Sequence, residues 1–312
     1  FHEWCGEMLR TYHVPLKTGK GKPWDLQVES VVDGVERGLI PRGQYGAVLI
    51  DEGHDFEPEW LNLVVQMVDP ATDSFLLLYD DAQSIYRKSK GLGFSLSSVG
   101  VKANGRTTIL RLNYRNSREI LKFAYDFAKG DLGPATADDD HIPLIEPESA
   151  GTSGAQPVFR LEESFDDEVK YAARCVERWV AKGVPLNEIA IICFKERQGA
   201  AVSRLFSQAG IEHLWMGTRT TKRAYDPGSD KVTVVRAPRS KGLEFQSVVV
   251  GGVGALEDGA AQVAEHTKLL YVAMTRAKRQ LAVTSSERNH FAVRLENADA
   301  ARTGLQLEQR VA

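Results

Sequence analysis

The sequence predicts an α/β fold with largely parallel sheets. Six short segments rich in Val, Leu and Ile are spaced along the chain, and stretches with helical periodicity lie between several of them. The strand candidates are 47–51, 75–79, 189–194, 231–235, 246–251 and 280–284. The chain has 312 residues, of which 43% are hydrophobic, so it is long enough for two modest domains with apolar cores.

The elements between these strands follow from periodicity and composition. The basic, Gly-rich stretch at 17–23 is expected to be a loop, and the segment 130–157, rich in Gly, Pro, Ala and Asp, to be a surface excursion or insertion. Continuous apolar runs such as VLI and FLLLY are typical of strands buried on both faces of a parallel sheet. Helices are expected near the start (1–10) and at 57–68, 116–129, 165–182, 196–209 and 264–277.

Composition restricts the possible partners and the compartment. The formal net charge is −3, so binding to nucleic acid would have to come from a local basic patch. Cys5, Cys175 and Cys193 are scattered and fit no metal-ligand spacing, which predicts free thiols in a reducing cytoplasm. The sequence contains no apolar run of membrane-spanning length and no signal-peptide pattern, so no membrane partner is expected.

Two adjacent acids, Asp51 and Glu52, follow the first strand candidate directly in VLIDEGHDF. The carboxyl ends of parallel strands form the crevice in which α/β proteins bind ligands. One of the two acids can hold a hard cation while the other accepts a proton. The alternative is a helix start, with Asp55 capping a helix that begins near Pro58, although this leaves Asp51 unexplained.

The next strand candidate ends in similar chemistry, in LLLYDDAQSIYR. Gln83 can donate and accept hydrogen bonds, so it can contact a phosphate oxygen and a water at once. A polar turn that opens a helix is the alternative. Further along, Tyr114 and Arg115 lie between a strand-like stretch and a helix capped by Asn116 or Ser117. There the tyrosine can supply a ring for stacking and the arginine a guanidinium that binds phosphate. The alternative is that both are ordinary surface residues.

Two later segments also place charge beside buried strands. Lys241, Gly242 and Glu244 precede the strand candidate at 246–251. The stretch KLLYVAMTRAKRQLAV is expected to be a helix that carries Arg276, with Lys278 and Arg279, near its end. A solvated helix C-terminus, where cations are favoured, explains that basic cluster by default.

Taken in order, DE-x-x-D, QSIY, NYR, KGLEF and YVA-x-TRA resemble motifs II to VI of the UvrD/Rep-type superfamily 1 DNA helicases. The resemblance spans residues 45–285, and FHEWCGEMLR is similar to a further segment of the family's first domain. It implies two RecA-like (P-loop NTPase-type) parallel-sheet domains. The first, incomplete, would cover 1–110 and the second 111–312, with a short insertion around 130–157.

The resemblance also implies ATP and Mg²⁺ as cofactors and assigns roles to individual residues. Asp51 would hold the metal, Glu52 would polarise the attacking water, and Gln83 would sense the γ-phosphate. The second domain would supply the two arginine fingers and the other nucleotide contacts: Arg115 and Arg276 as fingers, Tyr114 against the adenine, and Lys241, Gly242 and Glu244 beside the nucleotide. A basic stretch at 217–241, together with Tyr86, would contact DNA, with Arg219, Lys222, Arg223 and Arg239 as its candidates; a solvated loop is the alternative.

The sequence departs from the family pattern at several points. It contains no G-x-x-x-x-G-K-[ST], and GKGKP at 19–23 is no substitute, so we expect a P-loop segment upstream in the same polypeptide and negligible ATP hydrolysis by this chain alone. His54 replaces the family's Gln, which could make coupling pH-sensitive, and RAP at 236–238 replaces T-x-H. About 125 residues separate Arg115 from Lys241, too few for the large helical insertion of full-size members.

The expected function is that of an ATP-dependent DNA helicase or translocase, 3′ to 5′ if the family polarity holds. Its partner would be single-stranded DNA or a junction of single and double strands. The alternative is a non-catalytic, helicase-derived module for nucleic-acid binding or docking. Binding alone does not require all five of the residues that the resemblance assigns to catalysis and metal binding: Asp51, Glu52, Gln83, Arg115 and Arg276. A metal-dependent nuclease built on Asp51 and Asp80 or Asp81 would need a further Lys in a nuclease arrangement, which the sequence does not supply.

Overall fold

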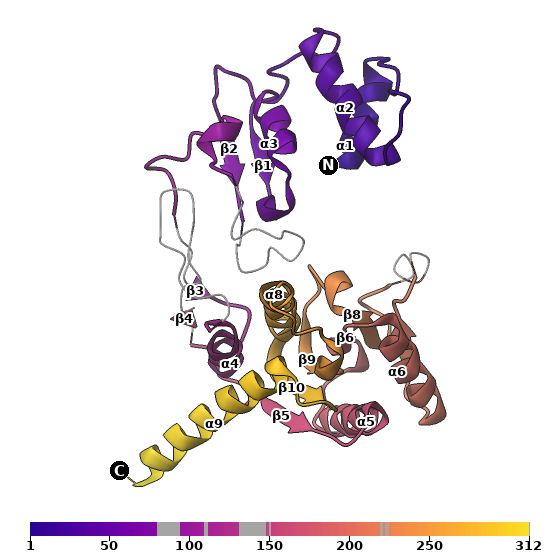
Figure 1. Cartoon of the computed structure of the whole chain (residues 1–312), viewed down its shortest axis with the longest axis vertical. Coiled ribbons are helices and arrows are strands. Elements are labelled where there is room, and N and C mark those ends of the chain that lie inside the picture. The colour runs from indigo at the N-terminus through magenta and orange to yellow at the C-terminus, as the bar shows by residue number, and fades with distance from the viewer. Residues whose placement is uncertain are drawn as a thin grey trace. The chain divides into compact units, whose positions relative to one another are not determined.

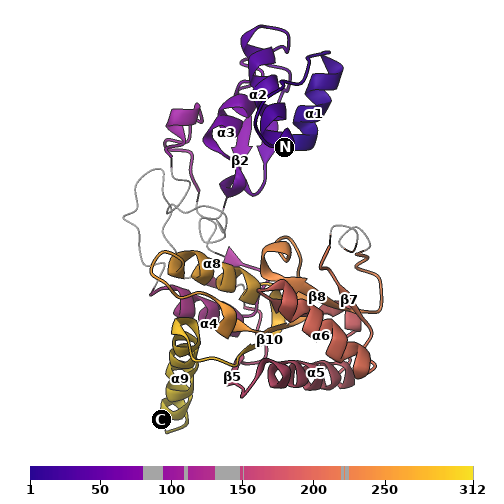
Figure 2. The same ribbon diagram turned by 45° about the vertical axis from the view of Figure 1, so that its right-hand side comes forward.

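The chain divides into two compact units (Figures 1 and 2). The computed structural model describes residues 1–79, 94–108, 112–130, 148–149, 151–218, 221 and 225–311. The first unit comprises the described residues of Phe1–Asp81 and Ser89–Thr108, and the second those of Ile109–Ala312. Each unit has apolar clusters of its own.

The first unit combines helices with a two-stranded parallel sheet. Its elements are α1 (His2–Thr11), α2 (Pro23–Glu36), β1 (Val48–Ile50), η1 (Gly53–Asp55), α3 (Pro58–Val65), β2 (Phe75–Leu77) and η3 (Ser97–Val99). Helices α1 and α2 pack together through buried residues that include Cys5, Met8 and Val31. Strands β1 and β2 pair in parallel, with Leu49 opposite Leu76.

The expectation that these two strands are buried on both faces is wrong. Ile50 is buried against α3 and η3, whereas Leu49 is 72% exposed and Leu76 is 48% exposed. Successive side chains of a strand point to opposite faces, and among the described residues the helices cover only one of them.

The second unit is built on a six-stranded sheet in which every pair of neighbours is parallel, in the order β5-β10-β9-β6-β8-β7. These strands are β5 (Val158–Leu161), β6 (Ile189–Cys193), β7 (His213–Trp215), β8 (Val232–Arg236), β9 (Phe245–Val250) and β10 (Ala277–Ser285). A short parallel pair, β3 (Leu112–Asn113) and β4 (Glu148–Ser149), accompanies it. The predicted α/β fold with parallel sheets is therefore confirmed.

Helices cover both faces of the large sheet. They are α4 (Arg118–Ala128), α5 (Phe165–Ala181), α6 (Glu196–Gln208), α8 (Val263–Met274) and α9 (His290–Val311), with short turns η4 (Leu186–Glu188), η5 (Ala237–Arg239) and η6 (Val253–Ala255). Helices α5 and α6 lie side by side (Figures 1 and 2) and pack on Ile189 and Ile191 of β6. The alternate residues Ala190 and Ile192 face the cluster of α4, α8 and α9. Here the prediction of strands buried on both faces is confirmed.

The basic cluster near residue 276 is not the solvated helix end that its sequence predicts. Helix α8 ends at Met274, and β10 already begins at Ala277, so Lys278 and Arg279 belong to a strand. Arg276 lies in the connection and is only 2% exposed. The predicted insertion at 130–157 falls largely outside the described residues. The three cysteines are free, as predicted, and the structure shows that they are also buried.

Glu168, in the first turn of α5, is a buried acid that joins three elements of the second unit. Its Oε2 atom accepts hydrogen bonds from the Gly252 backbone N–H, at 2.7 Å, and from the Thr284 hydroxyl, at 2.6 Å. Burial raises the pKa of Glu168 above the ordinary value of a glutamate, and these hydrogen bonds oppose the shift only in part.

Glu168→Gln is therefore expected to gain stability relative to the unmodified protein as the pH rises. Because the folded-state pKa is raised, the stability contributed by this acid is complete below the unfolded-state pKa and is lost as the pH rises through the folded-state pKa. Urea unfolding of both proteins between about pH 4 and pH 7 measures the difference. Glu177→Gln, at an exposed position of the same helix, is the control. A difference in unfolding free energy between Glu168→Gln and the unmodified protein that does not vary with pH would contradict the raised pKa of Glu168.

Candidate functional site

The two predicted acids of the first unit follow β1 in a strained turn. Glu52 has φ 55° and ψ 38°, a left-handed conformation that is uncommon for residues other than glycine. Such a conformation costs about 1–3 kcal/mol and persists where surrounding contacts hold it, often at functional sites. The Asp51 carboxylate accepts a hydrogen bond from the Glu52 backbone N–H at 2.9 Å, and Asp51 is exposed.

A glycine holds this turn against the end of β2. The Gly53 N–H donates to the Leu78 carbonyl at 2.8 Å, and the Leu78 N–H donates to the Ile50 carbonyl at 2.8 Å. A Cβ atom at Gly53 would lie 2.3 Å from the Leu77 side chain, so the close approach excludes larger residues unless Leu77 moves. The predicted Gln83 and Tyr86 lie outside the described residues.

His54 is buried beside the two acids and contacts Glu52. Its side chain is fully buried, and its Nε2 atom is 3.2 Å from a Glu52 carboxylate oxygen and 3.8 Å from an oxygen of Asp55. The imidazole therefore fixes the direction of the Glu52 carboxylate. Asp55 lies in η1, and the N-cap position of α3 belongs to Glu57, so the prediction that Asp55 caps this helix is wrong.

Three predicted residues of the second unit meet at one edge of the large sheet. Glu244 and Arg276 directly precede the neighbouring strands β9 and β10, and the Phe245 N–H donates to the Arg276 carbonyl at 3.0 Å. The Glu244 carboxylate then pairs with the Nε atom of Arg115 at 2.5 Å and lies 3.9 Å from the Lys278 ammonium. The meeting point is the amino end of the strands, whereas the acids of the first unit follow a carboxyl end.

Arg276 is fixed by backbone carbonyls from two segments. Its Nε atom donates to the Val272 carbonyl at 3.1 Å, in the last turn of α8, and its Nη1 atom lies 3.4 Å from the Leu243 carbonyl. The guanidinium is thus held between α8 and the residue before Glu244. Such anchoring keeps a buried arginine in one orientation, which phosphate recognition requires.

Asn116 joins the Arg115 segment to the Arg276 segment, a role that sequence reasoning missed. Its buried side-chain amide donates to the Thr275 carbonyl at 2.8 Å and to the Ala277 carbonyl at 2.6 Å, on either side of Arg276. The Ser117 N–H adds a hydrogen bond to the Lys278 carbonyl at 2.9 Å. The N-cap of α4 is Ser117, so Asn116 is a clamp between segments and not a helix cap.

The remaining predicted residues differ in their surroundings. Tyr114 is 75% exposed, Lys241 is half-buried, and Gly242 has φ 80°, which strains any other residue there. Arg239 donates to the Met216 carbonyl at 3.0 Å and to the Gly217 carbonyl, so its guanidinium supports the segment after β7. The other DNA candidates of this stretch lie outside the described residues: Arg219, Lys222 and Arg223.

Comparison with known families identifies the second unit. A model described as UvrD-like helicase C-terminal domain matches residues 108–222, and a second model with the same description matches residues 231–284. The two matches together cover more than half of the chain and include Arg115, Glu244 and Arg276. The chain therefore contains a UvrD-like helicase C-terminal domain, to which residues 108–222 and 231–284 belong.

Other comparisons add little. No curated protein matches the chain. A solved structure, the C-terminal domain of a possible DNA helicase from Lactobacillus plantarum WCFS1, is 19% identical, with a TM-score of 0.41. The similarity covers 59% of this chain and 94% of that chain. No helix among the described residues is both long and apolar enough to cross a membrane.

Proposed function

We propose that this chain supplies the second RecA-like domain and part of the first domain of an ATP-dependent DNA translocase or helicase. The observation that supports this most strongly is the convergence of Arg115, Glu244 and Arg276 at one sheet edge, although 161 residues separate the two arginines in sequence. Phosphoryl transfer depends on cations placed around the transferred group, and a guanidinium supplied by a second domain accelerates it by about 10³–10⁵.

The acids of the first unit fit the complementary half of such a site. Within the described residues, no group of three or more His, Cys, Asp or Glu side chains could hold a metal ion. Magnesium in nucleotide sites needs only one or two carboxylates, since phosphates and water complete its coordination. Asp51, exposed beside Glu52, provides one such donor, and the bound ion would neutralise phosphate charge. Glu52, directed by His54, would orient the attacking water.

In the second unit, the proposed nucleotide contacts surround the arginine cluster. Glu244 holds Arg115 by a partly exposed ion pair, so a phosphate oxygen can compete for the same guanidinium. Tyr114 offers an exposed ring for an adenine, and Lys241 and Gly242 complete the turn before Glu244. Arg239 would act by supporting the basic segment that follows β7, which we propose as a DNA contact.

The whole enzyme would need a P-loop, which we place upstream in the same polypeptide. In this proposal, residues 1–110 complete the P-loop domain and residues 111–312 form its partner. Closure of the two domains on ATP, followed by opening after hydrolysis, would move single-stranded DNA stepwise, 3′ to 5′ by the family polarity.

The test is the structure of the P-loop-bearing protein with Mg²⁺, ADP and aluminium fluoride, on single-stranded DNA. We expect both arginines and Glu52 to lie around the fluoride. A protein that binds DNA but takes up no nucleotide would instead be the non-catalytic module.

A further inference from the structure

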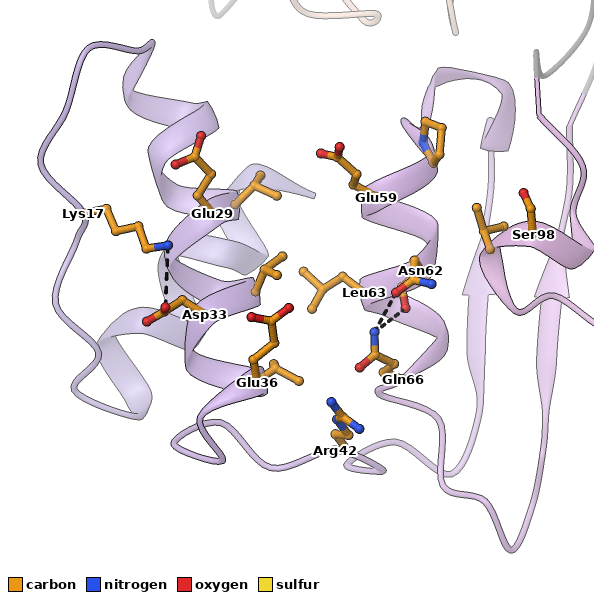
Figure 3. Close-up of a pocket in the computed structure, with 15 residues that line it drawn as sticks. Lys17, Glu29, Asp33, Glu36, Arg42, Glu59, Asn62, Leu63, Gln66 and Ser98 are labelled. Atoms are coloured by element: carbon orange, nitrogen blue, oxygen red, sulfur yellow. Dashed lines mark hydrogen bonds and ion pairs between the residues drawn. The ribbon is translucent and has the colours of Figure 1, made fainter.

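A groove with a volume of about 610 Å³ opens between α2 and α3 of the first unit, and none of its lining residues belongs to the proposed nucleotide site (Figure 3). Its floor is apolar, and the side chains that form it also pack into the core of the unit. The floor residues are Val28, Val32, Val35, Leu63 and Val99. Val28 is 4% exposed and Leu63 is 2% exposed.

Four carboxylates line the groove above this floor. Glu29, Asp33 and Glu36 lie at helical spacing on α2, and Glu59 lies on α3. Asp33 is engaged by Lys17 at 3.6 Å and by Arg37 at 3.2 Å.

The other three acids have no ion-pair partner within the part of the chain that the structure describes. Figure 3 shows Glu36 and Glu59 reaching from the two helices toward the space between them, with Arg42 at the end away from Glu59.

The charge and shape of the groove restrict its occupant. Three carboxylates without ion pairs repel nucleic acid and attract cations. The floor leaves too little exposed apolar surface for a large hydrophobic anchor, but it can accept the aliphatic stem of a lysine or arginine, whose charged end then reaches the rim.

The spacing of the acids along α2 agrees with a polypeptide occupant. Glu29 and Glu36 are seven residues apart on one helix, which corresponds to about 10.5 Å, or two helical turns. A partner segment can present basic side chains over that length in a fixed arrangement.

We infer that this groove binds a short basic segment of a partner protein. Lysine or arginine stems lie on the valine floor, and their charged ends pair with Glu29, Glu36 and Glu59. Arg42 disfavours cations at its own end, so the basic side chains of the partner gather toward Glu59. The inference does not depend on the proposed ATPase function, since no residue is shared between the two sites.

The experiment measures binding of a fluorescein-labelled Lys/Ala peptide to the full 312-residue chain by anisotropy. Glu36→Gln/Glu59→Gln is expected to weaken binding by about tenfold or more, as for the loss of close charge pairs. Arg42→Ala is expected to tighten it. Asn62→Trp, which fills the groove from α3, is expected to abolish it without removing a charge.

The matched control is Glu3→Gln/Glu7→Gln, which removes two exposed carboxylates from α1 and is expected to leave the affinity unchanged. Melting temperatures confirm that each variant is folded. Equal weakening by both double variants would overturn the inference, because it would indicate attraction to net charge alone. Binding of spermidine that competes fully with the peptide would overturn the assignment to a polypeptide partner.

Discussion

Replacing Arg115 by alanine is expected to lower DNA-stimulated ATP turnover of the P-loop-bearing protein by about 10³–10⁵-fold. The guanidinium would act on the transferred phosphoryl group, so its loss removes charge stabilisation from that group. Stability should change little, because the Arg115–Glu244 pair is partly exposed, and such pairs contribute about 0–1 kcal/mol. Steady-state hydrolysis and a thermal melt measure the two effects.

Two further variants make this result specific. Arg118→Ala removes an exposed arginine from the first turn of α4 and is expected to keep full turnover. Arg115→Lys keeps the charge but loses the planar fork, so it is expected to remain strongly impaired. The 312-residue chain alone, which we expect to hydrolyse ATP negligibly, provides the background reference. Turnover of Arg115→Ala within about threefold of the unmodified protein would remove Arg115 from the reaction, since a finger is worth far more.

Asn116→Ala is expected to lower the free energy of unfolding by about 2–4 kcal/mol. The substitution removes two hydrogen bonds and leaves the Thr275 and Ala277 carbonyls without their donor in a buried environment. Since these carbonyls flank Arg276, turnover of the P-loop-bearing protein should also fall, because the backbone that positions the second arginine loses its clamp. Urea unfolding measures the stability change.

Asn187→Ala is the matched control for this clamp. Asn187 also donates its side-chain amide to a carbonyl, that of Pro227 at 2.7 Å, but the pair is exposed and water can replace it. The expected cost is therefore about 1 kcal/mol or less. Equal destabilisation by the two substitutions would contradict the role of Asn116 as a buried clamp.

Part of the fold follows from local pattern, and the remainder depends on what covers each element. The apolar runs predict β6 and β9 because both have helices on each face, which is the situation that such runs indicate. The same kind of run at β1 predicts burial that the structure does not show, because an apolar sequence cannot specify whether a second layer is present. Helix α2 is not among the predicted helices, although Val28, Val31 and Val35 follow helical spacing.

In the candidate site, too, local features could be predicted from the sequence and long-range contacts could not. The positions of Asp51 and Glu52 after a strand and of Arg115 before a helix could be predicted, because they follow from local sequence pattern. The burial of Arg276 could not, since it depends on the Leu243 carbonyl, 33 residues away in sequence. Asn116 has the same limitation, because its partners lie 159 and 161 residues further along the chain.

The most direct measurement of the central claim is the crystal structure of the P-loop-bearing protein with DNA, Mg²⁺, ADP and aluminium fluoride. If acids of the first unit and arginines of the second act on one nucleotide, Arg115 and Arg276 will both lie within about 3 Å of the fluoride. Glu52 will then contact the water opposite the leaving oxygen. A fully occupied, closed complex in which neither arginine reaches the nucleotide would contradict the account.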